Sequence, residues 1–335
     1  MLWYNQPMIK NRLVLIDAYA LIFRAYYSIP AHFSDSLGRP TNAVYGFVLA
    51  LLNAINELQP EYLAVGIDVG KSNHHKEYKD YKAHRPPAPD DLKAQVPLVY
   101  EVAKAMNIPM IGVEGYEGED IIATIVAKIR NPNDECQIES IIVTGDMDTL
   151  QLIDEATKVY INGRSGQQST LYDAQKVKER YGLTPTQFVD YKALRGDPSD
   201  NIPGVPGIGE KTATMLIQKF NSLDELYTQI SKSEFLMSNQ IPNPNAKKQK
   251  ELAENKKISE KVTRLLIENK QTAFLSQKLA TIQKNAPIEF KLRDARIHDY
   301  DQKKVVELFQ KLGFKSLIPR LHTEIKPENP QQSLF

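Results

Sequence analysis

The sequence predicts an α/β fold in which a mainly parallel sheet, covered by helices on both faces, is followed by a helical domain. Three observations indicate this. Short β-rich apolar runs alternate with helical patterns in the first half of the chain. From about residue 184 the strand signals fade while helical spacing continues. The length of 335 residues suggests two domains rather than one.

The elements of the first half follow from their apolar runs and stop signals. Residues 42–58 carry apolar side chains at helical spacing, and we expect this helix to stop before Pro60, which cannot continue it. A second helix is expected over 119–129. The expected strands are 12–16, 62–67, 109–113, 140–144 and 158–161.

The second half is expected to consist almost entirely of helices. We expect them over 185–195, 210–220, 223–230, 248–266, 272–282 and 302–312, with one strand-like run at 288–292. The Pro- and Gln-rich residues after Leu321 are typical of a tail.

Composition excludes several classes of protein. Apolar residues make up 42% of the chain and charged residues 25%, values that are ordinary for a globular protein and exclude a disordered or fibrous chain. The one cysteine, Cys136, cannot form an internal disulfide, so we expect a reducing, cytoplasmic setting. No apolar run approaches the roughly 20 residues of a membrane helix, so no membrane partner is expected.

Acidic side chains follow four of the expected strands at the point where each strand ends. Because the carboxyl ends of parallel strands share one edge of a sheet, we expect these acids to converge. A further acidic pair follows the helix expected over 185–195. The full set is Asp17, Asp68, Glu117, Glu119, Asp120, Asp146 and Asp148, with Asp197 and Asp200 from the second half.

Such a cluster predicts bound cations. Two like charges ~4 Å apart repel by about 4 kcal/mol at an effective dielectric of 20, so several pairs would rival the stability of a whole domain. Ligands that are all oxygens select Mg²⁺ or Mn²⁺, and two such ions can serve phosphodiester hydrolysis. Nine of the 41 acids lie in this set, so the rest of the chain carries 32 acids against 42 Lys and Arg residues. This basic remainder suits a nucleic-acid partner.

A glycine-rich segment between two expected helices predicts a phosphate-binding hairpin. Glycines allow a tight turn and a close approach, and the amides that open the next helix then face a phosphate. Such a hairpin grips a backbone without reading sequence. A plain helix–helix turn is the alternative, which the added lysine disfavours. The candidate residues are Gly204, Gly207, Ile208, Gly209, Lys211 and Thr212.

Cations and aromatic residues interleave over about 69–91. This composition suits single-stranded nucleic acid, through phosphate contacts and base stacking, although a solvated loop is the alternative for this segment taken by itself.

These motifs together resemble one known family. Segments 81–87, 115–120, 144–148 and 196–212 are similar to those of the 5′-to-3′ exonuclease domain of bacterial DNA polymerase I, in the flap endonuclease family. The resemblance runs from about Leu13 to Leu321 and does not include the polymerase domains. It implies a PIN-like nuclease core over 8–183 with a helical arch at about 69–91, and a helix–hairpin–helix DNA-binding domain over 184–322.

The resemblance also implies roles for the candidate residues. Six acids, from Asp17 to Asp146 in the order given above, would hold one Mg²⁺ or Mn²⁺ or its water shell, and Asp148, Asp197 and Asp200 would serve the second. Lys82 and Arg85 would face the scissile phosphate, Tyr81 would stack on a base and Arg24 would contact phosphate. The hairpin would bind backbone phosphate with a K⁺ ion. The implied substrates are branched, nicked or flapped DNA and RNA–DNA primer junctions in replication and repair.

Two features bear on how far the resemblance extends. The family pattern Glu-Ala-Asp-Asp is here Glu117-Gly118-Glu119-Asp120, in which Glu119 keeps the charge but reaches one methylene further. The tail, 323–335, contains Gln331, Ser333, Leu334 and Phe335, similar to the peptide with which bacterial proteins bind the sliding clamp. Whether the chain is a stand-alone nuclease or a fragment stays open.

Two other functions compete with a nuclease. A haloacid-dehalogenase-type phosphatase would use Asp146 as a covalent nucleophile, but leaves Asp17, Asp68 and the glycine hairpin unexplained. A DNA- and clamp-binding scaffold without activity would predict broken metal positions, and every such position here keeps a carboxylate.

Overall fold

The fold is a six-stranded sheet with a helical extension. A computed structural model describes residues 11–130, 138–163, 169–297 except 239–257, and 300–322. The strands are β1 (Arg12–Asp17), β2 (Tyr62–Gly66), β3 (Met110–Ile111), β4 (Glu139–Thr144), β5 (Thr157–Ile161) and β6 (Thr170–Tyr172). Their order is β3-β2-β1-β4-β5-β6, and all neighbours are parallel except β5 and β6. The predicted parallel sheet is confirmed.

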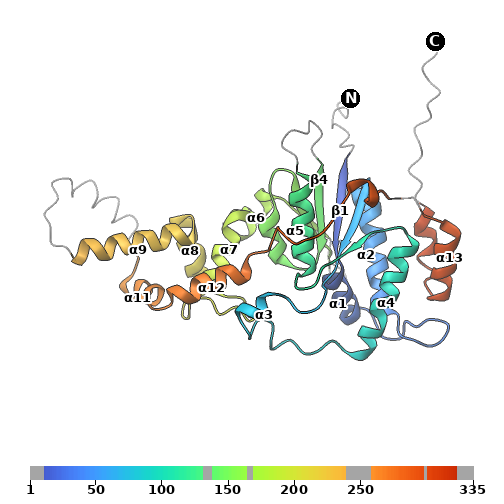
Figure 1. Ribbon diagram of the computed structural model, residues 1–335, viewed down its shortest axis with the longest axis horizontal. Coiled ribbons are helices and arrows are strands. Elements are labelled where there is room, and N and C mark those ends of the chain that lie inside the picture. The colour runs from blue at the N-terminus through green and yellow to red at the C-terminus, as the bar shows by residue number, and fades with distance from the viewer. Residues whose placement is uncertain (1–10, 131–137, 164–168, 239–257, 298–299, 323–335) are drawn as a thin grey trace, which may run out of the picture.

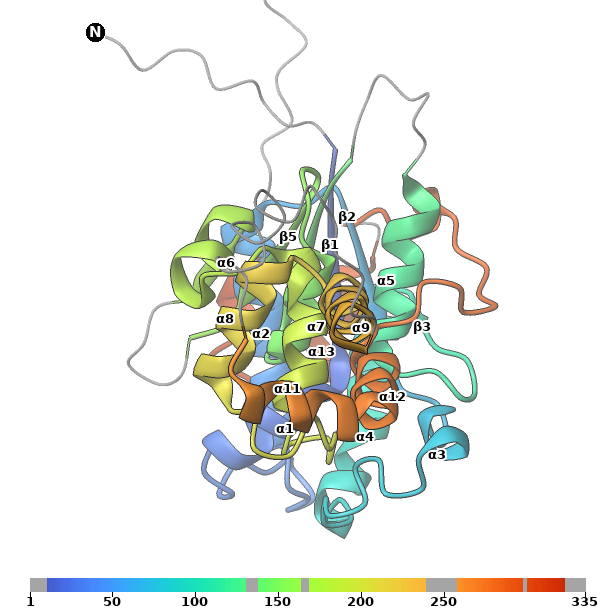
Figure 2. The same cartoon turned by 90° about the vertical axis from the view of Figure 1, so that its left-hand side faces the viewer.

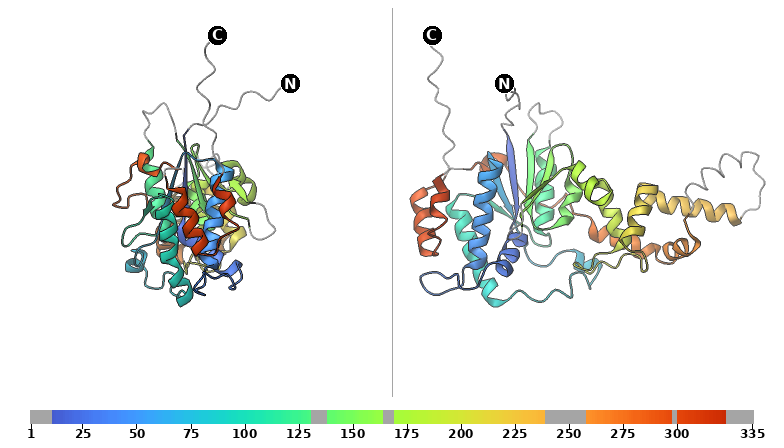
Figure 3. Two further views of the ribbon diagram at one scale, coloured as in Figure 1. Left: turned by 90° about the vertical axis from the view of Figure 1, so that its right-hand side faces the viewer. Right: turned by 180° about the vertical axis from the view of Figure 1, so that it is seen from behind.

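Both faces of the sheet are buried, because successive apolar residues of the central strands point to opposite faces. Leu13 and Leu15 join the core on one face, and Val14 and Ile16 join the core on the other. Helix α5 (Gly118–Ile129) covers the first face. The second is covered by α1 (Ala18–Ser28), α2 (Asn42–Leu58), α4 (Asp90–Ala105) and α13 (Gln302–Lys311). Figure 3 shows these helices against the sheet.

The helices begin and end at residues with clear local signals. Asp17 caps α1 by accepting a hydrogen bond from the Ala20 amide at 3.2 Å. Helix α2 ends at Gln59, which adopts a left-handed φ of 46° directly before Pro60. Two short helices, α3 (His74–Glu77) and η1 (Met147–Leu152), follow β2 and β4, and α6 (Ala174–Tyr181) follows β6.

The helical part extends away from the sheet, as Figures 1 and 2 show. It contains η2 (Pro185–Gln187), α7 (Phe188–Arg195), α8 (Glu210–Phe220), α9 (Leu223–Ser238), α11 (Glu260–Glu268) and α12 (Lys270–Ala280). Helices α7 and α12 pack together at its base. Most of the helix expected over 248–266 lies outside the described residues, and α11 begins at Glu260.

The run after α12 differs from expectation. The strand predicted over 288–292 is wrong: the segment has no partner strand, and its Ile288 instead packs into the core beside α5 before η3 (Leu292–Ala295). A single isolated bridge joins Tyr62 to Arg296. The chain then returns to the sheet, where α13 and η4 (Ile318–His322) pack with α4 and α2 rather than with the helical part. Within the residues described, no helix is both long and apolar enough to cross a bilayer.

Candidate active site

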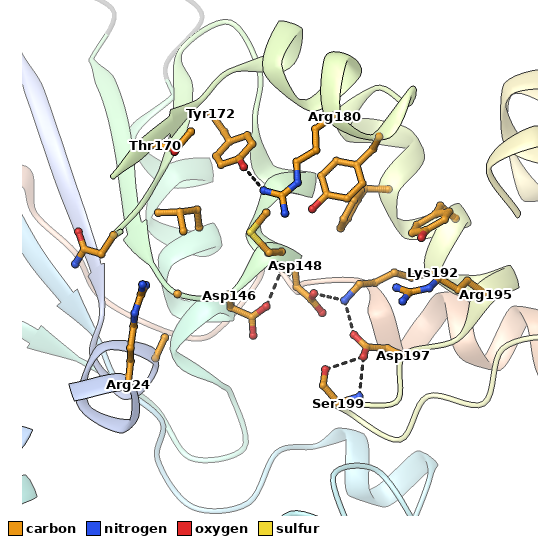
Figure 4. A pocket seen from close by; sticks show the side chains of 18 of the residues that line it. Arg24, Asp146, Asp148, Thr170, Tyr172, Arg180, Lys192, Arg195, Asp197 and Ser199 are labelled. Atoms are coloured by element: carbon orange, nitrogen blue, oxygen red, sulfur yellow. Dashed lines mark hydrogen bonds and ion pairs between the residues drawn. The ribbon is translucent and has the colours of Figure 1, made fainter. Parts of the chain in front are cut away.

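The predicted acids gather where the carboxyl ends of β1, β2 and β4 meet the base of the helical part. Figure 4 shows one side of this region, with Asp146, Asp148 and Asp197 close together. They line a pocket of about 1010 Å³. Asp17 and Glu119 belong to the same cluster, because the negative charge of Asp146 raises the pKa of both.

Asp17 lies at the centre, at the junction of β1 and α1. Its carboxylate is 7% exposed and accepts a hydrogen bond from Thr144 Oγ1 at 2.8 Å. Burial, with Asp68 beside it, raises the pKa of Asp17 to about 7. Burial likewise raises the pKa of Asp68, which accepts a hydrogen bond from the Gly118 amide. Both groups would gain from a cation that offsets the lost hydration.

The start of α5 supplies three acids in two different roles. Glu117 and Asp120 form a capping box, in which Asp120 accepts from the Glu117 amide at 3.0 Å. The other Asp120 oxygen accepts from the Gln283 amide at 2.7 Å, so this side chain ties α5 to the segment after α12. Glu119 points into the cluster, where burial, Asp146 and Glu117 raise its pKa well above the usual value.

One basic residue of the site, a lysine on α7, belongs to no motif of the sequence. It joins an acid of η1 to an acid of the helical part. Lys192, on α7, is 4% exposed and donates hydrogen bonds to Asp148 and Asp197. Burial opposes the charge of Asp197, yet Lys192 holds its pKa at about 2. At Asp148, burial and the charge of Asp146 outweigh the effect of Lys192, so the pKa of this carboxyl rises to about 7. The signal available in the sequence was a lysine that stands directly between Tyr191 and the apolar pair Ala193 and Leu194 of α7.

The predicted arch residues meet the acids directly. Lys82 Nζ donates to Glu117 and lies 3.5 Å from Asp200, and Arg85 forms an ion pair with Asp200. Burial alone would raise the pKa of Glu117, but Lys82 keeps it below its usual range. The arch segment therefore bridges the two parts of the molecule, because Asp200 belongs to the helical part and Glu117 to the sheet part.

The ring of Tyr81 is buried in the folded chain. Its ring is 2% exposed and packs with Leu279 and Ala280 at the end of α12, and with the ring of His74 at 5.0 Å. Its hydroxyl donates to Asp200 at 3.3 Å. In this arrangement Tyr81 anchors the arch to the helical part, and its stacking on a base stays a prediction.

Arg24, to which the resemblance assigns a phosphate contact, approaches the same pocket from α1. Figure 4 shows its side chain directed toward Asp146. It packs beside Gly145, where an added Cβ would lie 3.8 Å from the Arg24 side chain. A glycine before Asp146 thus leaves room for the guanidinium.

The glycine hairpin joins α7 to α8. Gly204 has a φ of 63°, and a Cβ there would lie 2.3 Å from the Gly196 nitrogen, so no other residue fits. Gly207 also has a positive φ, 85°, whereas Gly209 precedes α8 with a negative φ and free space around it. Ile208 is buried, while Lys211 is exposed and Thr212 half-buried. The buried Ile208 and Gly204 anchor a turn in which Gly207, Gly209 and Lys211 are exposed.

The donor set fits hard divalent cations. It is made entirely of carboxylates, and several of them have raised pKa values because burial removes their hydration and like charges lie beside them. Glu117 Oε1 is buried and has no hydrogen-bond partner among the described residues. Within that part of the chain no three acids are already gathered at ligand spacing, because Lys82 and Lys192 stand between pairs of them. The predicted clamp-binding residues lie outside the described residues.

Two family models together match most of the chain. The model of the 5′-3′ exonuclease N-terminal resolvase-like domain matches residues 12–182, and that of the 5′-3′ exonuclease C-terminal SAM fold matches residues 183–303.

Among proteins of similar sequence are two bacterial DNA polymerases I. That of Caldicellulosiruptor bescii is 38% identical over 313 residues, which cover 92% of this chain and 33% of the polymerase. That of Bacillus subtilis is 35% identical over 326 residues, covering 97% of this chain and 34% of the polymerase. The chain thus spans about a third of the length of these curated relatives.

Solved structures show the same fold at low sequence identity. The T5 D15 protein crystallised with metal ions has a TM-score of 0.60 at 18% identity, over 90% of this chain and all of that one. The catalytic core of Rad2 in complex with DNA substrate has a TM-score of 0.54 at 17% identity, over 93% of each chain. From the two matched models and the polymerase relatives, the chain belongs to the 5′-3′ exonuclease family.

Proposed function

We propose that the chain is a Mg²⁺- or Mn²⁺-dependent, structure-specific 5′-to-3′ exonuclease and 5′-flap endonuclease of the bacterial cytoplasm. Its substrates would be branched, nicked or flapped DNA and RNA–DNA primer junctions in replication and repair. One observation carries the proposal: carboxylates from separate strand ends and from the helical part converge at a pocket that arginines and lysines surround. An acidic centre inside a cationic rim suits metal ions and a phosphodiester together.

The acids would hold two metal ions. When bound, these ions would lower the pKa of a water and offset the charge of the departing 3′ oxygen. Asp120, with both oxygens on backbone amides, would position α5 and Glu119 rather than meet an ion directly. The proposed set for one ion or its water shell is Asp17, Asp68, Glu117, Glu119 and Asp146, with Asp120 supporting it through α5, and the set for the other ion is Asp148, Asp197 and Asp200.

Cations of the chain would hold the substrate strand. Lys82 and Arg85 lie beside Glu117 and Asp200, so a phosphate that enters the acidic pocket meets both at once. Arg24, on α1, lines the same pocket. The exposed Gly207, Gly209 and Lys211 of the hairpin would bind backbone phosphate of the downstream duplex, with a K⁺ ion among the turn carbonyls.

Solved structures with the same fold support the proposal that the chain binds DNA and metal ions. The T5 D15 flap endonuclease has been crystallised with DNA and metal ions, and the Rad2 catalytic core with DNA substrate. The phosphatase alternative is set aside, because the family of the chain is that of 5′-3′ exonucleases. A scaffold without activity remains the outcome to test against.

Cleavage of a 5′-labelled double-flap DNA tests the proposal. We expect release of a short 5′ product with Mg²⁺, none with chelator, and a loss of at least about 100-fold in Asp146→Ala. The matched control is Asp301→Ala, because Asp301 also caps a helix, α13, but lies outside the acidic cluster. This control should cleave like the native chain.

Two results would contradict the nuclease assignment. Tight flap binding without cleavage in either Mg²⁺ or Mn²⁺ would indicate a scaffold. Cleavage that persists fully in Asp146→Ala would place the chemistry elsewhere.

We also propose that the tail binds a bacterial sliding clamp through Gln331, Ser333, Leu334 and Phe335. The support is the sequence alone, in which two apolar anchors follow a polar stretch. Clamp affinity should fall at least tenfold in Leu334→Ala with Phe335→Ala, while cleavage without clamp stays unchanged. Equal clamp binding by the native chain and the double variant would show that these residues do not bind the clamp.

A further inference from the structure

Two exposed arginines outside the acidic set line the same pocket. Arg180 lies at the end of α6 and Arg195 at the end of α7, and both are directed toward the space above Asp148 and Lys192 (Figure 4). Neither arginine belongs to the acidic set or to the glycine hairpin.

Buried tyrosines hold both arginines in place. The Arg180 guanidinium donates to the Tyr172 hydroxyl and lies 5.2 Å from the ring centroid of Tyr181. That of Arg195 lies 5.8 Å from the ring centroid of Tyr191. Tyr172 is 7% exposed and Tyr191 is 3% exposed, so these rings are fixed parts of the core. Aromatic faces thus preorganise two cations whose outer N–H groups remain free to donate.

Among the described residues, no acid neutralises the charge of either arginine. Lys192 and Arg85, which line the same pocket, are each paired with an acid of the cluster. Neither Arg180 nor Arg195 has a carboxylate within ion-pair distance in the part of the chain that the structure describes. Two fixed guanidinium groups without an acidic partner form a site for an anion.

The pocket continues from these arginines toward the hairpin. A second hollow of about 330 Å³ shares Arg180, Tyr181, Tyr191 and Glu210 with the first, and adds Lys211. The arginines therefore lie between the acidic cluster and the hairpin lysine. Glu210 is the one carboxylate on this wall outside the proposed metal ligands, so an anion would be repelled from its side and kept at the arginine side.

We propose that Arg180 and Arg195 bind consecutive backbone phosphates of the strand that runs from the acidic cluster to the hairpin. They are positioning residues: they would fix the distance between the hairpin contact and the bond that is cut. This inference rests on the proposed nuclease function, and it adds a phosphate site on the wall formed by β6, α6 and α7.

Binding measured in chelator tests this site separately from cleavage. The variants are Arg180→Gln, Arg195→Gln and the double variant, with nicked and single-flap DNA as probes over a range of salt. We expect roughly tenfold weaker binding per substitution, and a salt slope smaller by about 0.9 for each lost phosphate contact. Lys178→Gln is the matched control, because Lys178 is exposed on α6 but lines neither hollow, so its slope should equal that of the native chain.

Neutral linkages identify the phosphates. Single methylphosphonate substitutions should weaken native binding at two adjacent positions of one strand and have no further effect in the double variant. Removal of the terminal 5′ phosphate instead should leave the arginine contribution intact, since the site is for internal phosphates. Arg180→Lys should restore the salt slope but only part of the affinity, because lysine lacks the fork held by the tyrosines.

Cleavage with Mg²⁺ then tests positioning. The double variant should cut several neighbouring bonds where the native chain cuts one. Native affinity and salt slope in the double variant, or an equal loss in Lys178→Gln, would overturn the site. A native chain that binds flaps with this arginine dependence but never cleaves would overturn the nuclease function and leave the phosphate site standing.

Discussion

The two ends of the sheet carry opposite electrostatic arrangements. At the amino end, Glu139 of β4 lies 2.7 Å from Arg12 of β1 and 2.7 Å from Lys158 of β5. Burial alone would raise the pKa of Glu139, but the two cations hold it below its usual value. At the carboxyl end, acids outnumber cations, and the pKa values of Asp17 and Asp148 rise to about 7.

The difference separates stability from function within one sheet. Each charge at the amino end has a partner, so that end favours the folded state. At the carboxyl end, Asp17, Glu119 and Asp148 lose hydration and gain like-charged neighbours, so these acids oppose folding until cations arrive. A cluster that costs stability persists because it does chemistry.

The largest expected effect is the loss of activity when one acid of the carboxyl end is neutralised. Glu119→Gln should lower flap cleavage at least about 100-fold, because it removes one ligand charge from the proposed site. The same change should raise the free energy of unfolding in chelator by ~1 kcal/mol, because it removes a repelling carboxylate. Cleavage rates and denaturant melts of one preparation measure both. A variant that is both less stable and fully active would contradict the comparison.

The next effect is stabilisation by the metal. In Mg²⁺ at about 100 times its dissociation constant, the native chain should gain roughly 2.7 kcal/mol over the chelated protein. Glu119→Gln should gain much less, whereas Glu139→Gln should gain as much as the native chain. Thermal melts with and without Mg²⁺ test this. Equal gains in all three proteins would show that the ion binds elsewhere.

A smaller effect is expected at the amino end. Glu139→Gln removes both ion pairs and leaves Arg12 and Lys158 without their acid, so stability should fall by about 1 kcal/mol. Cleavage should stay within twofold of the native rate, because these residues lie at the edge opposite the pocket. Urea melts and flap cleavage are the measurements, and a large loss of cleavage without loss of stability would contradict the assignment of roles.

The smallest effect is a pH dependence of that same pair. The pKa of Glu139 is lowered in the folded state, so its contribution is complete above the ordinary value of 4.5 and is lost as pH falls through the folded value. The stability difference between the native chain and Glu139→Gln should therefore be constant at neutral pH and shrink below about pH 4.5. A difference that grows toward acid would have the wrong sign for a lowered pKa.

The sheet and the acidic edge could be predicted because they depend on local signals. Apolar runs mark the strands, and Asp17 and Asp68 come directly after two of them. Parallel topology then brings such ends together. Strand lengths were less predictable: β3 is only Met110–Ile111, because the edge of the sheet stops pairing where the chain turns toward α5.

What the sequence could not supply are the partners from distant segments. Lys192 is separated from Asp148 by the whole of β5, β6 and α6, and only the folded chain joins them. Tyr81 is an aromatic residue among cations, which favours a role in base stacking, yet α12 covers its ring. The strand predicted at 288–292 has apolar residues at a suitable period, but no neighbouring strand is there to pair with it. The assignments of the remaining site residues stay predictions until cleavage is measured.

The return of the chain to the sheet after the helical part has a consequence for synthesis on the ribosome. Phe309 and Phe314 are buried on the face formed by α1, α2 and α4, together with Leu321. That face therefore stays partly open to solvent while residues 183–300 are translated and folded. The emerging chain must protect an apolar surface for this time, by chaperones or by transient contacts. Truncation before α13 should yield a chain that is synthesised but aggregates, although most of its pocket residues are present.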